Sequence, residues 1–423
     1  MLQLNYIREN QEDVITRLAV KNFNAKEQVE KILFIDADRR KIQTELDTLN
    51  AESNTLAKQI GDLFKTGKQA EASELKNKSA ALKETSKKLE LALSSTEEEL
   101  NKILVLLPNL PSSKVPKGKT PADNEVVHSE GEIPKLSANA KPHWELTQQY
   151  DIIDFELGVK LTGAGFPVYK GKGAKLQRAL INFFLDRATT AGFLEIEPPI
   201  MVNEASGFGT GQLPDKEGQM YHVTVDNLYL IPTAEVPITN IYRDTILKAE
   251  DLPIKNCGYT PCFRREAGSY GKDARGLNRL HQFDKVEIVE IAHPDKSYDV
   301  LEEMRNYVAG LLKDLGLPFR ILKLCGGDMS FASALTYDFE TYSAAQQKWL
   351  EVSSVSNFES FQSNRSKIRF RDGNGKPQLA HTLNGSALAL PRIVATLLEN
   401  NQTEKGIRIP KVLVPYTGFE IID

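Results

Sequence analysis

The sequence predicts an α+β protein, with an N-terminal antiparallel helical hairpin followed by a domain built on an antiparallel β-sheet flanked by helices. Apolar residues between positions 42 and 107 recur at alternating four- and three-residue steps, and no proline occurs before Pro108. Beyond Pro142, strand-like runs joined by loops favour an antiparallel sheet over a doubly wound parallel one. Because 423 residues exceed one ordinary core, two domains are expected.

The hairpin is predicted from two series of heptad positions, one from Ile42 to Leu63 and one from Leu75 to Leu107, with a reversal at 64–68. Each arm of about 35 residues would be roughly 50 Å long. Serines and a threonine interrupt the seam, so the two arms are expected to be held together modestly. The segment alone favours an oligomerisation coiled coil, and the alternative is a rigid arm that reaches a large partner. Its lysines are interleaved with acids, which is typical of a solvated face.

The rest of the chain divides into a linker and a mixed region. Six prolines between 108 and 142 interrupt helices and suit an extended chain. Neither a P-loop pattern nor a GxGxxG after a strand is present, so ATP would require another architecture. Helices are predicted at 174–188 and 297–315, and strands at 227–231, 258–265, 280–291, 348–355 and 380–384.

Composition excludes several classes of protein. The net charge of −4 argues against coating nucleic acid through bulk positive charge, although it leaves room for a local basic surface. No apolar run approaches the ~20 residues of a membrane span, and the first residues lack a secretory pattern. Cys257, Cys262 and Cys325 form neither a zinc-like pair nor a disulfide framework. A reducing, cytoplasmic location is therefore expected.

The most informative block runs from Cys262 to Glu287. In a strand, alternate side chains share a face, so Arg264 is expected to point with Glu266. On the return strand, Phe283, Lys285 and Glu287 would share a face, with the intervening apolar residues in the core. The block would then line a polar concavity over a sheet. The alternative is a set of cross-strand ion pairs on an exposed face.

This block, FRREAGSYGKDARGLNRLHQFDKVE, resembles motif 2 of the class II aminoacyl-tRNA synthetases, in its seryl branch. The resemblance covers essentially the whole chain, and it implies a serine–tRNA ligase with a class II catalytic domain at 143–423. It also implies a tRNA-binding domain at 1–107, with the hairpin at about 26–104, and a linker at 108–142. Other segments similar to the family are 192–199 (motif 1), 209–214, 231–235, 351–354 and 382–392 (motif 3).

For ATP, the resemblance implies that Arg264 bridges the serine carboxylate and the α-phosphate, which suits the planar fork of a guanidinium. Arg392 would hold the γ-phosphate, Glu266 would accept from the adenine amino group, and Phe283 would stack on the ring. These arginines and Glu266 are the implied catalytic residues, because the transition state gathers charge on phosphate oxygens. The resemblance adds Glu351 and Ser354 as Mg²⁺ ligands, and Arg265, Leu280, Val352 and Ser353 as further ATP contacts.

For L-serine, the resemblance implies that Thr233 and Glu235 take the ammonium group and that Glu287 meets the hydroxyl or the ammonium group. Ala234, Arg264, Asn384 and Ser386 complete the implied pocket. A buried site built to bond a hydroxyl rejects alanine and glycine, because its polar groups are left unpaired. Threonine must be refused by size. No extra editing domain is expected in a chain of this length, which is consistent with selection at one site.

For tRNA, the resemblance implies that the hairpin contacts the long variable arm of tRNA-Ser docked to the other subunit of a homodimer. The loop 268–279, with Lys272, Arg275 and Arg279, would guide the terminal adenosine, and the alternative is an ordinary connection. The sequence leaves open whether tRNA-Sec is also charged. One departure from the family lies in motif 3, where Ala387 and Pro391 replace glycines. If the helix begins near Ala387, Pro391 lies close to its first turn, where proline is tolerated.

Two other functions remain as alternatives. A seryl-synthetase-like paralogue could charge a carrier protein, but such relatives tend to lose the hairpin. A non-catalytic RNA-binding scaffold should have lost Arg264, Glu266 or Arg392, and all three are present. A threonyl enzyme is disfavoured because the sequence has no suitably spaced Cys/His zinc set. The cysteines fit small buried apolar positions better.

Overall fold

A computed structural model describes every residue of the chain except 216, 267–274 and 374. Contacts divide the chain into two compact units. One unit comprises residues 2–19 and 23–108, and the other comprises residue 1, residues 20–22 and residues 109–423.

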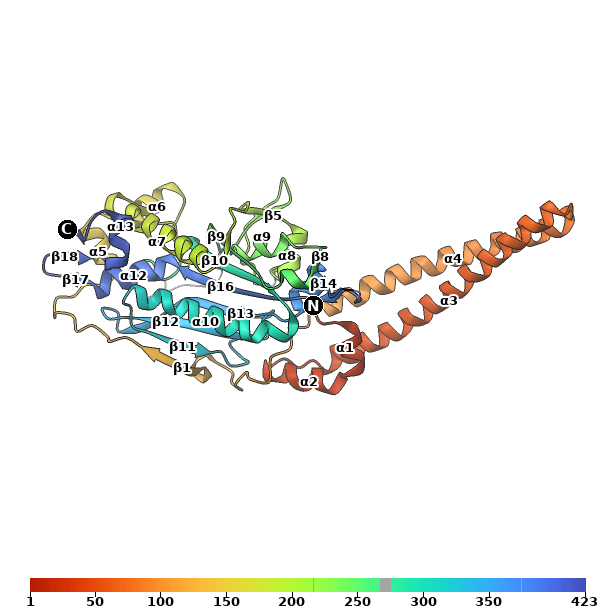
Figure 1. Ribbon diagram of the computed structural model, residues 1–423, viewed down its shortest axis with the longest axis horizontal. Helices are drawn as coiled ribbons and strands as arrows, with labels where there is room; N and C mark the ends of the chain where they lie inside the picture. Colours follow the sequence, from red (N-terminus) through yellow and green to blue (C-terminus); the bar gives the residue numbers. More distant parts are fainter. Residues whose placement is uncertain (216, 267–274, 374) are drawn as a thin grey trace. The chain divides into compact units, whose positions relative to one another are not determined.

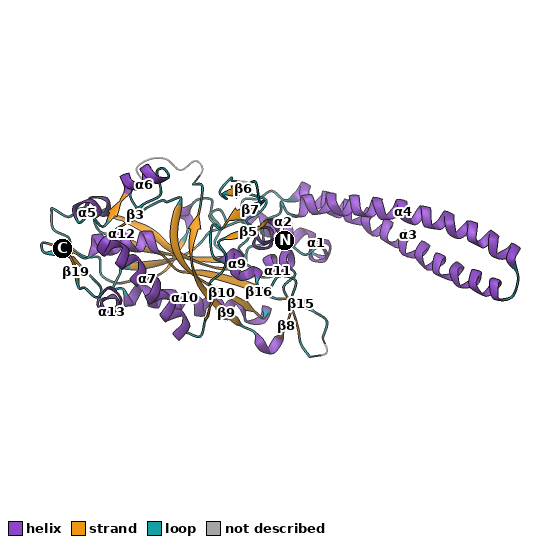
Figure 2. Cartoon of the chain, turned by 90° about the horizontal axis from the view of Figure 1, so that it is seen from above, coloured by secondary structure: helices purple, strands orange, loops and turns teal. Residues whose placement is uncertain are grey.

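The N-terminal unit is helical. Helices α3 and α4 run antiparallel along each other and form the predicted hairpin, which is confirmed (Figure 2). The ion pairs Lys31–Glu99 (3.5 Å) and Lys78–Glu52 (2.9 Å) join equivalent levels of the two arms and so report their register. The helices of this unit are α1 (Leu4–Glu9), α2 (Gln11–Val20), α3 (Lys26–Lys65) and α4 (Gln69–Leu104).

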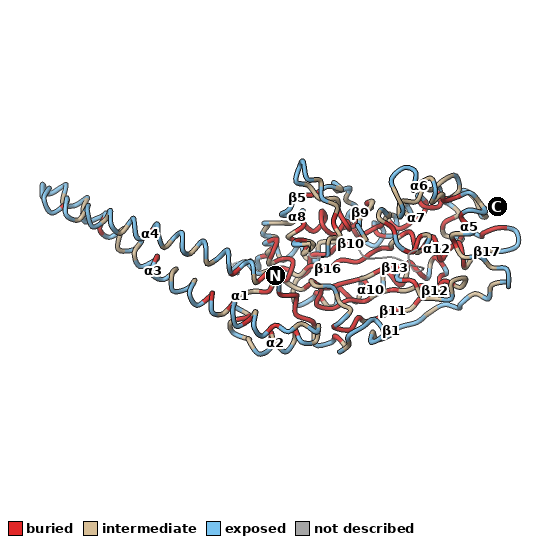
Figure 3. The backbone as a smooth tube through the Cα atoms, turned by 180° about the vertical axis from the view of Figure 1, so that it is seen from behind, coloured by how far each residue is buried: buried red, intermediate tan, exposed pale blue. Residues whose placement is uncertain are grey.

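The two arms of the hairpin are joined by a narrow seam. Leu46, Leu56 and Leu100 are buried in it, whereas most of the hairpin surface is exposed (Figure 3). Ser86 is also buried there, which agrees with the predicted interruption of the apolar stripe. At the base of the hairpin, the buried carboxylate of Asp36 is neutralised by Arg8 and two arginines on its own helix. Such a seam buries little apolar surface per turn, so the arms are held modestly.

An eight-stranded sheet forms the centre of the second unit, in the order β1-β11-β12-β13-β16-β10-β9-β4. All neighbouring pairs are antiparallel except β4 with β9, and the predicted antiparallel sheet is confirmed. Its strands are β1 (Glu125–Glu130), β4 (Leu194–Glu195), β9 (Ile254–Phe263), β10 (Gln282–Ala292), β11 (Phe319–Lys323), β12 (Leu335–Ser343), β13 (Lys348–Asn357) and β16 (His381–Ala389).

Shorter elements surround this sheet. The other described helices are α5 (His143–Gln149), α6 (Phe155–Leu161), α7 (Gly171–Thr190), α8 (Glu204–Thr210), α9 (Glu235–Asn240), α10 (Ser297–Asp314), α11 (Phe361–Ser366), α12 (Leu390–Asn400) and α13 (Val414–Thr417). The small strands are β2 (Ile153–Asp154), β3 (Val168–Tyr169), β5 (Met201–Asn203), β6 (His222–Val223), β7 (Leu228–Leu230), β8 (Ile246–Lys248), β14 (Arg369–Arg371), β15 (Gln378–Leu379), β17 (Gln402–Thr403), β18 (Gly406–Arg408) and β19 (Ile421–Ile422).

The two faces of the large sheet are used differently. Helices α7, α10 and α12 pack on one face, where Val286 and Ile288 of β10 join the main apolar core (Figure 1). The short helix α9 lies against the opposite face, where Val289 contacts Ala234 and Ile238. Alternation along β10 therefore sends Lys285 and Glu287 toward α9, and the polar site is built on that face.

Three details differ from the sequence-based expectation. The strand β16 continues to Ala389 and α12 begins at Leu390, so the predicted helix start near Ala387 is wrong. Between its pairs with Glu287 and Lys285 of β10, strand β16 has one extra residue, which forms a bulge. Ala387 lies in this bulge and is fully buried. Pro391 consequently lies in the first turn, where no helical N–H bond is lost. β9 ends at Phe263, two residues earlier than predicted.

The proline-containing segment 108–142 contains no α-helix, but it has a short 3-10 turn at Pro121–Asp123 and adds β1 to the edge of the large sheet by pairing with β11. Asn109 anchors its start, because its side-chain amide donates to the carbonyls of Ala332 and Phe358. Among the described residues, no helix combines the length and the apolar character that a membrane span requires.

Candidate active site

A buried lysine and a buried glutamate lie at the centre of the polar face. Lys285 is 5% exposed and Glu287 is 1% exposed, and both project from β10 toward α9. The Lys285 ammonium lies 2.6 Å from a Glu287 carboxylate oxygen and donates to the Thr233 hydroxyl at 2.9 Å. Thr233 precedes α9, and its hydroxyl also accepts the backbone N–H of Glu235 at 3.2 Å. The segment 233–235 is thus tied directly to the sheet.

Glu235 adds a second carboxylate to this cluster. Its Oε1 accepts from the Gln362 amide at 2.6 Å, and Gln362 is held in turn by the Thr382 hydroxyl. Burial, and then the charge of Glu287, raise the pKa of Glu235 to about 7, against hydrogen bonds from Gln362 and Asn384 and the charge of Lys285. Two carboxylates and one ammonium leave this buried cluster short of one positive charge when both acids are ionised.

Strand β16 supplies the third side of the cluster. Ser386 is paired with Glu287 across the sheet, and Asn384 hydrogen-bonds to Glu235. Residues paired in this way present their side chains on the same face. The structure therefore brings together the residues predicted for serine binding, namely Thr233, Glu235, Glu287, Asn384 and Ser386.

Arg264 lies just beyond the end of β9. Its backbone N–H donates to the His281 carbonyl at 2.9 Å, which continues the pairing of β9 with the segment that enters β10. Its side chain is exposed, and the guanidinium carbon lies 5.3 Å from the centre of the Phe283 ring. An exposed arginine held over an aromatic ring is well placed to meet a planar, anionic ligand.

Glu266 does not follow strand alternation. Strand β9 ends at Phe263, and the φ of Glu266 is 48°, in the left-handed region, so the premise that Arg264 and Glu266 alternate within a strand is wrong. Its carboxylate accepts from Arg279 at 2.8 Å. Of the predicted tRNA loop, Lys272 lies outside the described residues, as do 268–271, 273 and 274. Arg275 and Arg279 are described, and they lie on the returning limb of the loop, the segment 275–281 that leads back to β10.

Arg392, in the first turn of α12, reaches across to two other elements. Its Nε donates to the Asn278 carbonyl at 3.0 Å, and its Nη1 donates to the Glu351 carbonyl at 2.8 Å. The same nitrogen lies 3.6 Å from the Glu351 carboxylate. Motif 3 is therefore joined both to the motif 2 limb and to β13.

A bulge in β13 decides where Glu351 and Ser354 point. Glu340 is paired with Glu351 and Asp338 with Ser354, so β13 carries one extra residue between these pairs. In a regular strand, positions three apart face opposite sides, but the extra residue brings Glu351 and Ser354 to the same side. Asp338 joins them: burial, and then the charge of Glu351, raise its pKa well above the usual range, although the Ser354 hydroxyl bonds to it.

Several predicted contacts can be made only through the backbone. The side chains of Ala234, Leu280 and Val352 are buried in apolar clusters. The Ser353 hydroxyl is also buried and donates to the Ser386 carbonyl at 2.6 Å. Arg265 is exposed, and its backbone N–H donates to the Gln219 carbonyl at 2.9 Å.

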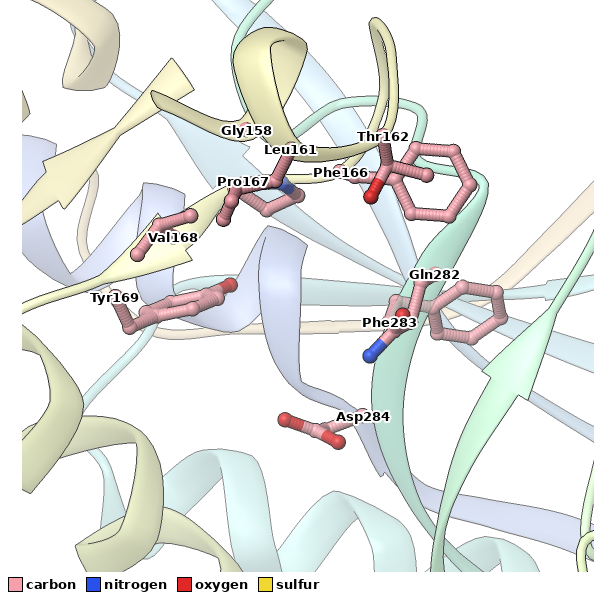
Figure 4. A pocket seen from close by; sticks show the side chains of 10 residues that line it. All are labelled: Gly158, Leu161, Thr162, Phe166, Pro167, Val168, Tyr169, Gln282, Phe283 and Asp284. Atoms are coloured by element: carbon pink, nitrogen blue, oxygen red, sulfur yellow. The ribbon is translucent and has the colours of Figure 1, made fainter. Parts of the chain in front are cut away.

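A cavity of about 230 Å³ is lined in part by Phe283. It lies between the α6–β3 segment and the start of β10, and Phe166, Tyr169 and Phe283 form aromatic parts of its wall (Figure 4). Figure 4 shows Phe283 and Asp284 pointing to opposite sides of β10. The Asp284 carboxylate is held from the helix side of the sheet by Gln177 and Tyr259, both at 2.8 Å.

The structure adds three residues to which the sequence had given no role. Lys285 was expected only to share a face with Glu287. The structure adds its hydrogen bond to Thr233, which lies more than fifty positions away in the sequence. Gln362 and Asp338 carry no motif of their own, and they enter the site through sheet pairing and through the packing of α11 on β16. The available signal was polarity within strand-like runs, which does not by itself distinguish an exposed face from a site.

Comparison with known proteins decides the family. Residues 1–111 match the family described as the seryl-tRNA synthetase N-terminal domain, and residues 221–401 match the class II tRNA synthetase core domain (G, H, P, S and T). The chain is 50% identical over 421 residues to a serine–tRNA ligase of Salinibacter ruber, an alignment that covers 99% of this chain and 98% of that protein. The chain belongs to the seryl-tRNA synthetase family.

Solved structures of the family agree with this assignment over the whole chain. A seryl-tRNA synthetase from Pyrococcus horikoshii, complexed with ATP, is 35% identical, with a TM-score of 0.92 and coverage of 100% of this chain and 99% of that one. A cytoplasmic serine–tRNA ligase from Naegleria fowleri, in complex with AMP, is 25% identical, with a TM-score of 0.87 and the same coverage. The class II fold of this family member is thus confirmed.

Proposed function

We propose that this seryl-tRNA synthetase family member is an ATP-dependent ligase that activates L-serine to seryl-adenylate, releases pyrophosphate, and transfers serine to the terminal adenosine of tRNA-Ser. The observation that carries the proposal is the buried cluster of Lys285, Glu235 and Glu287 beside Arg264. It offers carboxylates to an amino acid's ammonium group and an exposed guanidinium to its carboxylate and to a phosphate. The alignment with a serine–tRNA ligase covers 99% of this chain and 98% of that protein, which supports the same activity.

In the activation step, the serine carboxylate attacks the α-phosphorus of ATP, and negative charge gathers on the phosphate oxygens. Catalysis then depends on positioning and on fixed cations more than on a dedicated base. Arg264 would bridge the carboxylate and the α-phosphate, and Arg392 would hold the γ-phosphate from the other end. Phe283 would stack on adenine, and Glu266 would accept from its amino group. Arg265 and the backbone of Leu280, Val352 and Ser353 would complete the ATP site.

Mg²⁺ fits the donors on the β13 bulge. Glu351 and Ser354 present oxygens on one side, and Asp338 Oδ1 beside them is buried with no hydrogen-bond partner among the described residues. Within that part of the chain, no group of three or more His, Cys, Asp or Glu side chains is arranged to hold a metal alone. A Mg²⁺ ion bound here would therefore take its remaining ligands from phosphate oxygens and water, as Mg²⁺ usually does, and would neutralise phosphate charge.

The Asp338→Asn substitution is expected to stabilise the fold while weakening the binding of Mg²⁺. Burial raises the pKa of Asp338, so its ionised form destabilises the free protein at neutral pH, and asparagine should raise the melting temperature. The same change should increase, severalfold, the Mg²⁺ concentration needed for half-maximal ATP binding, measured calorimetrically. Asp299→Asn, at an exposed position of α10 in the same unit, is the control. An unchanged Mg²⁺ requirement would exclude Asp338 from the site.

Serine selection follows from the buried polar cluster. Thr233 and Glu235 would take the ammonium group, and Glu287, held by its 2.6 Å contact with Lys285, would meet the hydroxyl or the ammonium group. Asn384 and Ser386 would close the pocket, and Ala234 would contribute through its backbone. Alanine and glycine would leave Glu287 without its partner in a site that excludes water, which costs more than the lost contact alone.

Serine affinity is expected to depend on pH through Glu235. The pKa of Glu235 is raised from 4.5 to about 7, so the free protein holds a proton there that its unfolded chain loses near pH 4.5. The stability contributed by this proton is lost as the pH rises through 7. An ammonium group needs the ionised form, so the KM for serine should fall about tenfold between pH 6 and 8. Glu235→Gln should raise the KM and flatten this profile in pyrophosphate exchange, and a profile retained in the variant would contradict the assignment.

In the transfer step, Arg275 and Arg279 would guide the tRNA end, and the hairpin would contact the long variable arm. We further propose a homodimer, supported by the exposed Leu194 on the edge strand β4 in motif 1 (63% exposed). A cytoplasmic location, the boundaries 1–107, 108–142 and 143–423, and the charging of tRNA-Sec stay predictions. The hairpin and the retained arginines disfavour a carrier-protein ligase and a non-catalytic scaffold.

The experiment that tests the proposed function is amino-acid-dependent ATP–pyrophosphate exchange with serine, threonine, alanine and glycine, followed by charging of tRNA-Ser. Strong exchange with serine alone, together with transfer to tRNA, is the expected result. Exchange with serine but transfer only to a protein carrier would favour the paralogue. The absence of exchange with all four amino acids, in a folded protein that binds ATP, would overturn the ligase assignment.

A further inference from the structure

A buried histidine contacts the returning limb of the motif 2 loop. His143, the first residue of α5, is fully buried, and its Nε2 accepts the backbone N–H of Leu277 at 2.8 Å. The ring lies so close to Gly276 that a Cβ there would meet Nε2 at 2.3 Å. The next residue of α5, Trp144, stacks under the Arg275 guanidinium at 4.8 Å. Two consecutive residues of α5 thus hold three consecutive residues of the limb.

The other side of the ring is held by Glu399 of α12. Glu399 is fully buried, and its Oε1 lies 2.7 Å from His143 Nδ1 and accepts the His143 backbone N–H at 2.8 Å. Because Leu277 donates to Nε2, that nitrogen carries no proton, and the ring proton is on Nδ1, where it bonds to the carboxylate. The Ser343 hydroxyl donates to the second oxygen of Glu399. The ring is thereby fixed in one tautomer and one orientation.

The network closes on Arg392. The Gln346 amide donates to Glu399 at 2.8 Å, and its oxygen accepts from the Asn278 side chain at 3.0 Å. The carbonyl of Asn278 accepts from Arg392 Nε at 3.0 Å. Arg392 and Glu399 are seven positions apart on α12 and so lie on the same face of the helix. A displacement of the limb at Leu277 would move the very carbonyl that orients the Arg392 guanidinium.

We propose that His143 is a positioning residue for ATP: by holding Leu277 through Nε2 and Glu399 through Nδ1, it fixes the Asn278 carbonyl and with it the Arg392 guanidinium. This inference rests on the proposed contact of Arg392 with the γ-phosphate. It assigns to α5, which carries no class II motif, a part in nucleotide affinity. The centre of the network, His143 with Glu399, is fully buried and hydrogen-bonded at both ring nitrogens, and such a centre fixes one geometry because each broken bond leaves an unpaired group.

Two isosteric substitutions divide the role of the ring. The amide of asparagine can replace Nδ1 and keep the bond to Glu399, whereas the amide oxygen of glutamine can replace Nε2 and keep the bond to Leu277. The test measures the ATP dissociation constant of the full-length protein calorimetrically, below the melting temperature of each variant. His143→Asn is expected to weaken ATP binding about tenfold, and His143→Gln less than about threefold. His381→Asn is the matched control, because His381 also makes a ring hydrogen bond, to the Ser297 hydroxyl at 2.8 Å.

A double substitution tests whether the effect passes through Arg392. In an Arg392→Ala background, adding His143→Asn is expected to weaken ATP binding no further, since coupled residues are not additive. Should His143→Asn fail to fold, Gln346→Ala removes the Asn278 contact from the half-buried turn and should weaken ATP binding about threefold. If His143→Asn and Gln346→Ala both bind ATP with wild-type affinity while Arg392→Ala binds it more weakly, the inference is overturned and the proposed function still stands. Unchanged affinity in Arg392→Ala would overturn the γ-phosphate assignment itself.

Discussion

Replacing Arg264 with alanine is expected to reduce serine-dependent ATP–pyrophosphate exchange by a factor of about a hundred or more, mainly in kcat. The guanidinium would act on charge that develops on the α-phosphate during attack, so its loss affects the transition state more than the bound substrates. Its side chain is exposed and makes a single described contact, with the Phe283 ring, so the melting temperature should change little. The measurement is exchange at saturating serine and ATP.

A control and a conservative variant sharpen this experiment. Arg408→Ala removes an exposed arginine from β18, in the same unit but in a separate small sheet, and should leave exchange unchanged. Arg264→Lys keeps the charge but loses the planar fork, so it should recover only part of the rate. A loss in KM alone, with kcat retained, would show that Arg264 binds substrate without stabilising the transition state, and would contradict its assignment as catalytic.

Local patterns predicted the elements of the fold, but long-range pairing arranged them. The heptad positions were enough for α3 and α4, because a helical hairpin is built from contacts between neighbouring segments. Strand β1 was not predicted, since it lies in a proline-containing segment and pairs with β11, which is almost two hundred residues away. Sequence periodicity does not carry information of that range. The resemblance to motif 3 supplied the strand and the helix, and the pairing of Ala389 with Lys285 of β10 carries the strand further than predicted.

The candidate site shows the same division. Motif resemblance singled out Arg264, Glu287 and Arg392, whose roles stay predictions, while simple alternation failed wherever the backbone departs from a regular strand. Glu266 has a left-handed φ and lies beyond the end of β9, so strand alternation does not apply to it, and a bulge at Val352 brings Glu351 and Ser354 to the same side. Both departures depend on tertiary pairing. Lys285 was visible in the sequence, but its role required its distances to Thr233 and Glu287, which only the folded chain provides.

Shortening the hairpin is expected to separate the two steps of the reaction. The ion pair between Glu52 and Lys78 joins facing positions of α3 and α4, so residues 53–77 can be replaced by a short glycine-rich turn without changing the register below it. This variant should retain serine-dependent exchange at nearly the wild-type rate, because the serine and ATP residues all lie in the other unit. Charging of tRNA-Ser should fall by a factor of a hundred or more, measured as esterified serine at limiting tRNA.

The source of this loss distinguishes the two interpretations of the hairpin. If the hairpin binds the variable arm, the shortened protein should keep its oligomeric state in sedimentation and lose affinity for tRNA-Ser. Added salt should then reduce the difference in tRNA affinity between the shortened and the wild-type protein, because phosphate contacts are screened. If it is an oligomerisation coiled coil, shortening should shift the sedimentation coefficient while tRNA affinity per subunit is retained. Parallel loss of exchange and charging in a folded variant would contradict a division of labour between the two units, since the hairpin would then be required for activation itself.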